Sequence, residues 1–255
     1  MSDMLGGKVY RLSLDGRTDI VAEVPNRPSG LGFMPDHSLL IVSMRDRALL
    51  RLKAGSITKH SDLRSCAKGE PNDMVVDRYG RAYVGVFSFP RGAAANFADA
   101  ALVLVEPDGS ARMVAHDLAF PNGCGFARDG RLVVAETFRH RLTEFEVAED
   151  GALGQPMLFA NLGDVAPDGI CLDCKGGVWV AGSGSPCFVR VMAGGKATHR
   201  VCIPHRQAVA CALGGPDGRT LFCLTVDESF EDVEGCSATA QVHIAYVDSP
   251  ALQLC

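Results

Sequence analysis

The 255-residue sequence lacks several features that define other classes of protein. It has no basic excess, since 30 Asp and Glu residues outnumber 25 Lys and Arg residues, so nucleic acid is not expected as a partner. No apolar run approaches the roughly 18 residues that a membrane-spanning helix needs. The first residues lack the charged start and apolar centre of a signal peptide, and we expect a cytoplasmic protein that does not contact a membrane.

The sequence also lacks a helical apolar period and a second C-x₂-C pair. These absences limit the possible fold classes and the expected roles of the cysteines. No stretch of the sequence shows a convincing 3.6-residue apolar period, which argues against amphipathic helices. The ten cysteines are scattered, and several lie in apolar runs, so buried reduced thiols are expected. Cys171 and Cys174 form a C-x₂-C pair, but structural zinc usually takes two such pairs and the sequence has no second one. We therefore expect these two cysteines to be ordinary strand residues.

The sequence does contain a repeat, whose successive starts are 43, 50, 46 and 42 residues apart. Four copies begin with proline, and a fifth keeps the shape without it. The copies are PSGLGFMPDHSLLIVSM from Pro28, PNDMVVDRYGRAYVGVF from Pro71, PNGCGFARDGRLVVAET from Pro121, PDGICLDCKGGVWVAGS from Pro167 and VACALGGPDGRTLFCLT from Val209. Each copy is interpreted as a tight turn, a short apolar strand, an Asp/Gly turn and a β-branched second strand.

Units of about 45 residues with roughly four strands are typical of β-propeller blades. A β-sandwich with coincidental turns is the alternative, and the regular spacing disfavours it. The sequence therefore predicts an all-β, six-bladed β-propeller formed as one domain over residues 1–255. Residues 1–25 hold only the outer two strands of a blade, so the first blade is expected to be incomplete.

The second position of each copy is expected to lie at the mouth of the central channel. The residues at this position are Ser29, Asn72, Asn122, Asp168 and Ala210. Oxygen atoms of Asn and Asp suit a hard divalent cation such as Ca²⁺ or Mg²⁺, and they can also hold Zn²⁺. The alternative remains open, because Asn and Asp are also favoured in turns, where they bond their own backbone.

The same segments resemble the senescence-marker-protein, gluconolactonase and regucalcin family. The resemblance covers nearly the whole chain in order, through EPNDMVVDRYGRAYVG, FPNGCGFARDGRLVVAET, APDGICLDCKGGVWVA and ACALGGPDGRTLF. It implies a six-bladed propeller with one divalent metal ion in the channel. Most characterised members hydrolyse sugar lactones, and some hydrolyse other esters or organophosphates.

Three residues match the family pattern one by one. Asn122 matches a metal-binding Asn, and Asp168 matches the metal-binding Asp that also serves as the candidate catalytic base. Asn72 matches an Asn close to the metal that contacts substrate or a bound water. The resemblance thus implies Asn72, Asn122 and Asp168 as metal ligands and leaves the ion open between Ca²⁺, Zn²⁺, Mg²⁺ and Mn²⁺.

Two departures from the family pattern affect the expected activity. The family's first blade carries a Glu-Gly/Ser-Pro motif whose Glu binds the metal, and this sequence has no such motif. The segment SDMLGGKVYRLSLDG resembles the family segment that comes directly after that motif. The N-terminal part of the first blade is therefore expected to be missing through a mis-set start, a truncation or a real loss. Some sugar lactonases also have an Arg where this chain has Glu70, and the negative charge argues against the same substrate contacts.

Other residues near the expected channel mouth are candidates for substrate binding. Glu136 and His140 follow a second strand, and His205 precedes the fifth inner strand; a solvated turn is an equally simple interpretation. The alanine-rich segment that begins at Phe87 and the acidic segment that begins at Val226 are expected to form loops. The sequence predicts a metal-dependent hydrolase of a sugar lactone or related ester, with a weakly active or non-catalytic metal- or ligand-binding propeller as the alternative.

Overall fold

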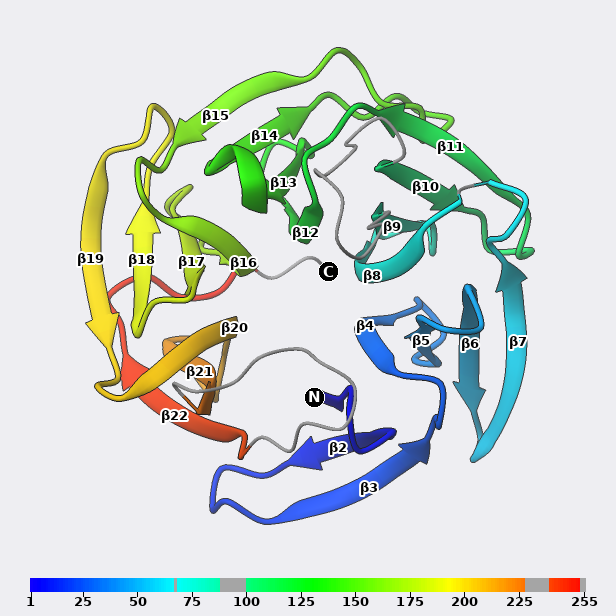
Figure 1. The fold of residues 1–255 in the computed structure, drawn as a ribbon, viewed down its shortest axis with the longest axis horizontal. Coiled ribbons are helices and arrows are strands. Elements are labelled where there is room, and N and C mark those ends of the chain that lie inside the picture. Colours follow the sequence, from blue (N-terminus) through cyan, green and yellow to red (C-terminus); the bar gives the residue numbers. More distant parts are fainter. Residues whose placement is uncertain (67, 88–99, 228–238, 253–255) are drawn as a thin grey trace, which may run out of the picture. The chain divides into compact units, whose positions relative to one another are not determined.

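Six antiparallel sheets make up nearly all of the computed structural model, which describes residues 1–66, 68–87, 100–227 and 239–252 (Figure 1). Each sheet is one blade, so the predicted all-β, six-bladed β-propeller is confirmed. By its internal contacts the chain divides into two compact units. Unit 1 comprises Met1–Pro121 and Glu149–Leu153, and unit 2 comprises Asn122–Ala148 and Gly154–Cys255.

Unit 1 holds the first three blades, β1–β3, β4–β7 and β8–β11. Their strands are β1 Ser2–Asp3, β2 Lys8–Leu12, β3 Thr18–Glu23, β4 Pro28–Phe33, β5 Leu39–Ser43, β6 Ala48–Lys53, β7 Ser56–Asp62, β8 Glu70–Val76, β9 Ala82–Phe87, β10 Ala101–Val105 and β11 Ala111–His116. The first blade differs slightly from the expectation of two outer strands. The two-residue strand β1 pairs with β2 and adds a short third strand to the sheet.

The other three blades lie in unit 2, apart from Pro121 at the start of β12. Their elements are β12 Pro121–Phe126, β13 Leu132–Glu136, the 3₁₀ turn η2 Thr137–Arg139, β14 Arg141–Phe145, β15 Met157–Asn161, β16 Ala166–Leu172, β17 Val178–Ser183, β18 Cys187–Val191, β19 Ala197–Cys202, β20 Arg206–Gly214, β21 Thr220–Asp227 and β22 Gln241–Tyr246. Within the described residues there is no helix long and apolar enough to cross a membrane. The loops expected from Phe87 and Val226 lie largely outside the described residues.

The core of each unit lies between neighbouring blades. Strands β5, β10 and β13 are buried at every residue, because each is paired on both edges within its sheet and packed on both faces. In unit 2 one apolar cluster joins Val133 and Leu142 of one blade to Val178 and Val189 of the next. Strands covered on both faces are expected to have continuous apolar runs, as in the sequences LLIVS and ALVLV.

The Pro-x-Gly segments lie within the first strands and are not turns, as the sequence interpretation had them. In β16 the pairing with β17 passes from Pro167↔Gly182 to Ile170↔Val180, so Asp168 and Gly169 lie opposite a single residue. Strands β4 and β8 have the same irregularity after Pro28 and Pro71. This arrangement is a β-bulge, which bends a strand and redirects a side chain, and it often lies beside an active site.

The glycine of Pro-x-Gly is required by the close approach of neighbouring first strands. A Cβ atom on Gly123 would lie 2.5 Å from the backbone N of Ile170 and 2.7 Å from the carbonyl O of Asp168. Likewise, a Cβ atom on Gly169 would lie 2.7 Å from the Cα of Ala210. Such distances exclude any larger residue unless the strands separate.

The contact between Gly169 and Ala210 also corrects the repeat alignment in the sixth blade. Ala208 pairs with Thr225 and Ala210 pairs with Leu224, which leaves Val209 as the extra residue of the bulge. Val209, and not Ala210, is therefore the counterpart of Asp168. The alignment of the fifth repeat copy with the other four was shifted by one residue, because this copy has no proline to mark its start.

Replacing Gly123 with alanine is expected to lower the free energy of unfolding by about 1–3 kcal/mol, because the added methyl group meets backbone atoms that cannot rotate away. Urea unfolding measures the change. Gly154→Ala is a matched control, since its added Cβ would have its nearest neighbour at 3.4 Å, an ordinary contact. Equal stabilities of the two variants would contradict the steric argument.

The cysteines differ in part from the expectation of reduced thiols throughout. Cys187 and Cys202 form a disulfide between directly paired positions of β18 and β19. Cys171 lies in β16 with its Sγ 3.6 Å from the Sγ of Cys211, whereas Cys174 lies in the following turn. Cys171 is therefore a strand residue as expected, whereas Cys174 is not, because β16 ends at Leu172.

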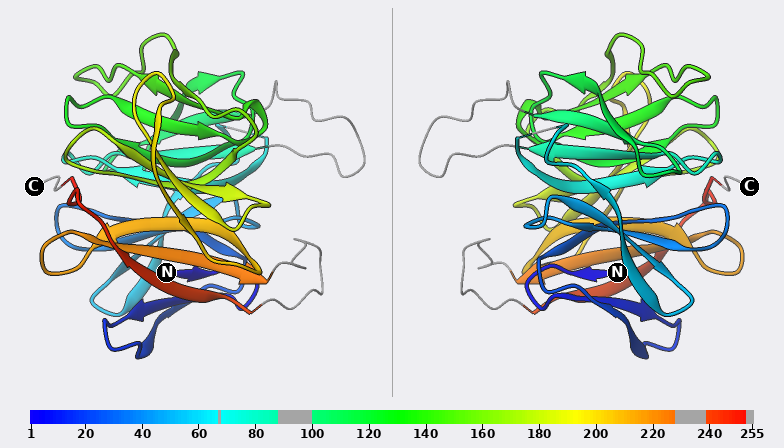
Figure 2. Two further views of the ribbon diagram at one scale, coloured as in Figure 1. Left: turned by 90° about the vertical axis from the view of Figure 1, so that its left-hand side faces the viewer. Right: turned by 90° about the vertical axis from the view of Figure 1, so that its right-hand side faces the viewer.

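The segment after β22 returns to the fifth blade (Figures 1 and 2). Ala251 forms a bridge with Asp173, and the N–H of Cys174 donates to the carbonyl of Pro250 over 2.9 Å. Beside them, the N–H of Leu252 donates to the carbonyl of Leu172. These backbone bonds fasten the end of the sixth blade to the turn between β16 and β17.

Candidate metal and active site

Asn122 and Asp168 occupy the same repeat position on neighbouring first strands of unit 2, β12 and β16. The two strands approach closely at this point, since a Cβ atom added to Gly123 would lie 2.7 Å from the carbonyl O of Asp168. Asn122 is buried, with 6% of its surface exposed, and Asp168 is partly buried. The fold therefore brings these two predicted ligands to adjacent strands.

Thr137 links Asn122 to the backbone just before Asp168. The Asn122 side-chain Nδ2 donates to the Thr137 hydroxyl over 3.3 Å, and that hydroxyl donates to the carbonyl of Pro167 over 2.7 Å. Thr137 is itself buried and begins the 3₁₀ turn η2. Sequence analysis did not single out Thr137, because its role depends on a contact with a residue 30 positions away.

Glu136 was predicted to bind substrate, but its side chain has no exposed surface. Its carboxylate accepts hydrogen bonds from Nη1 of Arg139 at 2.7 Å, Nε of Arg141 at 2.7 Å and the hydroxyl of Thr143 at 2.5 Å. A buried carboxylate is retained when it is paired and hydrogen-bonded in this way. In this position the Glu136 carboxylate stabilises the η2 turn that carries Thr137, and substrate contact by Glu136 stays a prediction.

The two histidines predicted to bind substrate lie in turns of unit 2. His140 ends η2 in a left-handed conformation, and its Nδ1 lies 3.0 Å from the carbonyl O of Gly163. His205 is exposed in the turn before β20, also with a positive φ of 62°. Substrate contact by either histidine stays a prediction.

Asn72 and Glu70 lie on β8 in unit 1. Glu70 begins the strand opposite Phe87, and Asn72 lies in the bulge, where its backbone carbonyl accepts a hydrogen bond from the Ser29 hydroxyl over 2.6 Å. Their predicted contacts with metal and substrate stay predictions. Sequence analysis overlooked the adjacent Asp73, whose pKa burial raises to about 6. The dipeptide Asn-Asp thus places a carboxyl group beside Asn72 at the same bulge.

The donor atoms fit a hard divalent cation in their chemistry, because amide and carboxylate oxygens are the ligands such ions prefer. The Asn122 hydrogen bond matters here: with Nδ2 directed at Thr137, the carbonyl oxygen Oδ1 is on the opposite branch of the amide. No three His, Cys, Asp or Glu side chains gather as a metal cluster in the described part of the chain. A cation bound beside Asp168 would therefore depend on amide oxygens as well as on that carboxylate.

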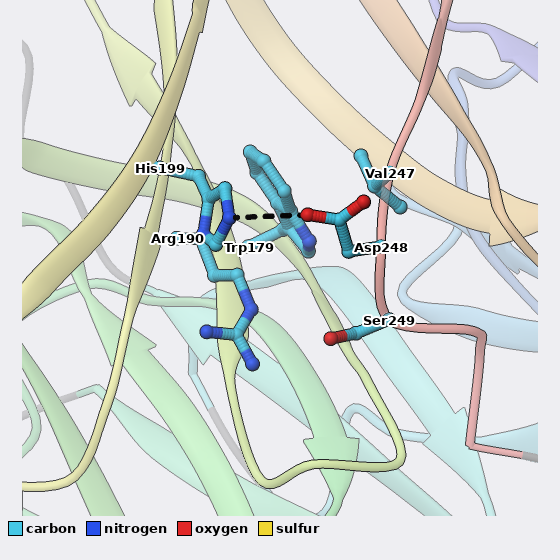
Figure 3. Close-up of a pocket in the computed structure, with 6 residues that line it drawn as sticks. All are labelled: Trp179, Arg190, His199, Val247, Asp248 and Ser249. Atoms are coloured by element: carbon cyan, nitrogen blue, oxygen red, sulfur yellow. Dashed lines mark ion pairs between the residues drawn. The ribbon is translucent and has the colours of Figure 1, made fainter.

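A separate small cavity lies on the fifth blade, and it is too small for a sugar lactone (Figure 3). Its volume of about 10 Å³ is only about the size needed to hold one water molecule. It is lined by Trp179, Arg190, His199, Val247, Asp248 and Ser249. His199 and Asp248 form an ion pair across it at 3.9 Å, while Arg190 is paired with the buried Asp173. Asp168 is not among the residues that line this cavity.

Comparison with known proteins shows the family to which the chain belongs. Residues 1–227 match the family model described as SMP-30/Gluconolactonase/LRE-like region. A pentonolactonase from Haloferax volcanii is 28% identical over 158 residues, which are 60% of this chain and 52% of that protein. A 6-deoxy-6-sulfogluconolactonase from Pseudomonas putida is 25% identical over 234 residues, or 89% of this chain and 79% of that protein.

Solved structures show the same fold. A gluconolactonase from Xanthomonas campestris superposes with a TM-score of 0.72 at 25% sequence identity, covering 87% of this chain and 77% of that one. The chain therefore spans about half to four fifths of the length of these three proteins.

Proposed function

The chain belongs to the SMP-30/Gluconolactonase/LRE-like family, and on that premise we propose that it hydrolyses a sugar lactone or a related ester with the help of one divalent cation. The observation that carries the proposal is the placement of Asn122 and Asp168 on the closely approaching first strands β12 and β16. Thr137 is bonded both to the Asn122 side chain and to the backbone just before Asp168. The names of the two curated relatives support a sugar lactone as the substrate class.

The proposed chemistry assigns a role to each of the matched residues. A bound divalent cation supplies Lewis-acid polarisation of the lactone carbonyl. Asp168 orients the attacking water and accepts its proton, while the water oxygen bonds to the carbonyl carbon. The ring C–O bond then breaks, and the proton passes to the ring oxygen, which leaves as the hydroxyl of a hydroxy acid. Asn122 would hold the cation through its amide oxygen together with the Asp168 carboxylate, and Asn72 would contact substrate or a bound water.

A lactone panel tests the proposal directly. The protein is first treated with a chelator, and Ca²⁺, Mg²⁺, Mn²⁺ or Zn²⁺ is then added singly with five- and six-membered sugar lactones. Acid release is followed with a pH indicator, because each ring opening yields a carboxylic acid. At least one cation is expected to raise the rate roughly tenfold or more above spontaneous hydrolysis. A rate that never depends on any cation would contradict the metal-dependent mechanism.

The second candidate function is binding of a metal or small ligand without turnover. One observation favours it: Asp168 is the single carboxylate among the five residues at the second repeat position, and fewer charged ligands weaken the binding of hard cations. Cation binding measured by calorimetry, without hydrolysis of any lactone in the panel, would support this second function.

A further inference from the structure

We propose that Thr137 is a positioning residue for the metal-binding site, an inference that rests on the proposed function. Its hydroxyl accepts a hydrogen bond from Nδ2 of Asn122 and donates one to the carbonyl of Pro167. One buried hydroxyl therefore sets the orientation of one predicted ligand and the backbone position of the other. Nothing in the repeat pattern assigns Thr137 this role.

The orientation of the Asn122 amide is the central point. An amide side chain has a donor branch and an acceptor branch, and only the acceptor oxygen can bind a cation. Because Thr137 donates its own proton to Pro167 at 2.7 Å, its oxygen is left to accept from the Asn122 Nδ2. The Asn122 Oδ1 atom is thereby turned to the opposite side, as metal binding requires.

The second bond of Thr137 acts on Asp168 through the backbone. Pro167 is the last paired residue before the bulge in β16, and its carbonyl belongs to the peptide that leads into Asp168. A hydrogen bond at this carbonyl restrains the peptide plane between Pro167 and Asp168. It thereby restrains the Asp168 Cα atom, from which the side chain projects. Outer hydrogen bonds of this kind are known to orient metal ligands, and their removal typically lowers metal affinity by roughly 10–100-fold.

Hydrogen bonds of the buried Glu136 carboxylate stabilise the η2 turn that carries Thr137. Glu136 precedes Thr137 and is bonded to Arg139, Arg141 and Thr143, so the turn is closed by buried charge-assisted hydrogen bonds. Thr137 itself is 6% exposed, which keeps water from competing for its hydroxyl. Thr137 therefore lies in a hydrogen-bonded turn and contacts the first strands β12 and β16.

Three variants test the inference. Thr137→Val keeps the shape and removes the hydroxyl, whereas Thr137→Ser keeps the hydroxyl. Thr220→Val is the matched control, because Thr220 is equally buried, at 3% exposure, and lies at the opposite end of the sixth blade from the bulge at Val209. Calorimetric titration with Mn²⁺ alone gives the metal affinity, and melting curves with and without Mn²⁺ confirm that each variant is folded.

The expected result is a fall of about 10–100-fold in Mn²⁺ affinity for Thr137→Val, with Thr137→Ser and Thr220→Val within about threefold of the unmodified chain. Where a lactone is turned over, kcat is expected to fall with the affinity. Thr137→Val that is folded and binds Mn²⁺ normally would overturn the role of Thr137 and leave the proposed function standing. An unmodified chain that binds no divalent cation would overturn both.

Discussion

Replacing Asp168 with asparagine is expected to lower the cation-dependent lactonase rate by about 10²–10⁴-fold, the usual contribution of a positioned general base. The asparagine has nearly the same shape, so the β16 bulge and its contacts with β12 and β20 are preserved. The variant loses both the base and the negative charge of the ligand, so metal affinity is expected to fall as well. Initial rates at saturating cation and calorimetric titration with the same cation measure the two effects separately.

Asp129→Asn is the matched control for this experiment. Asp129 lies in the turn between β12 and β13, where its side chain is 63% exposed and interacts with Arg131. Loss of its charge is expected to leave both the rate and the affinity unchanged. An Asp168→Asn variant that hydrolyses lactone at the unmodified rate, with unchanged metal affinity, would eliminate Asp168 as base and as ligand.

Replacing Asp173 with alanine is expected to lower the free energy of unfolding by about 3–5 kcal/mol, because it leaves a buried arginine without its counter-ion. The Asp173 side chain has no exposed surface and that of Arg190 is 7% exposed. Two hydrogen bonds join them, from Nε of Arg190 at 2.6 Å and from its Nη2 at 3.1 Å. Asp173 also accepts the backbone N–H groups of Lys175 and Gly177 at the β16–β17 turn.

The corresponding turn of the sixth blade offers the control for this measurement. Asp217 accepts the backbone N–H of Arg219 just as Asp173 accepts that of Lys175, but Asp217 is exposed. Asp217→Ala therefore removes the turn bond alone, which is expected to cost about 0.5–1.5 kcal/mol. Urea unfolding of both variants isolates the contribution of the buried ion pair. Similar losses for the two would show that the turn bond, and not the arginine, dominates.

The blades could be predicted from the sequence because the strand pattern that marks each blade is repeated and lies within one short segment. Each copy places a second strand rich in β-branched residues about ten residues after its first residue, and burial on both faces demands such apolar runs. The bulge was taken for a turn because proline, a polar residue and glycine suit both. Only the register, in which Asp168 and Gly169 oppose one residue, distinguishes the two.

The remaining differences concern contacts between segments distant in sequence. Asp168 was found because it recurs at a repeat position, whereas Thr137 acts on Pro167 in the next blade and carries no local signal. Glu136 resembled an exposed charge at a strand end, and its burial follows from three donors that only the fold assembles. The disulfide between Cys187 and Cys202 likewise depends on the pairing of β18 with β19.

The close approach of neighbouring first strands has a consequence for how such a chain can change its chemistry over evolutionary time. At the third repeat position, Gly123 and Gly169 set the distance to the next first strand, as between Gly169 and Ala210. The second position does not set that distance, and across the copies it is occupied by Ser29, Asn72, Asn122, Asp168 and Val209. Single codon changes can therefore exchange the donor atoms one at a time while the scaffold is inherited unchanged. Val209 marks a place where a new donor could be introduced in this way.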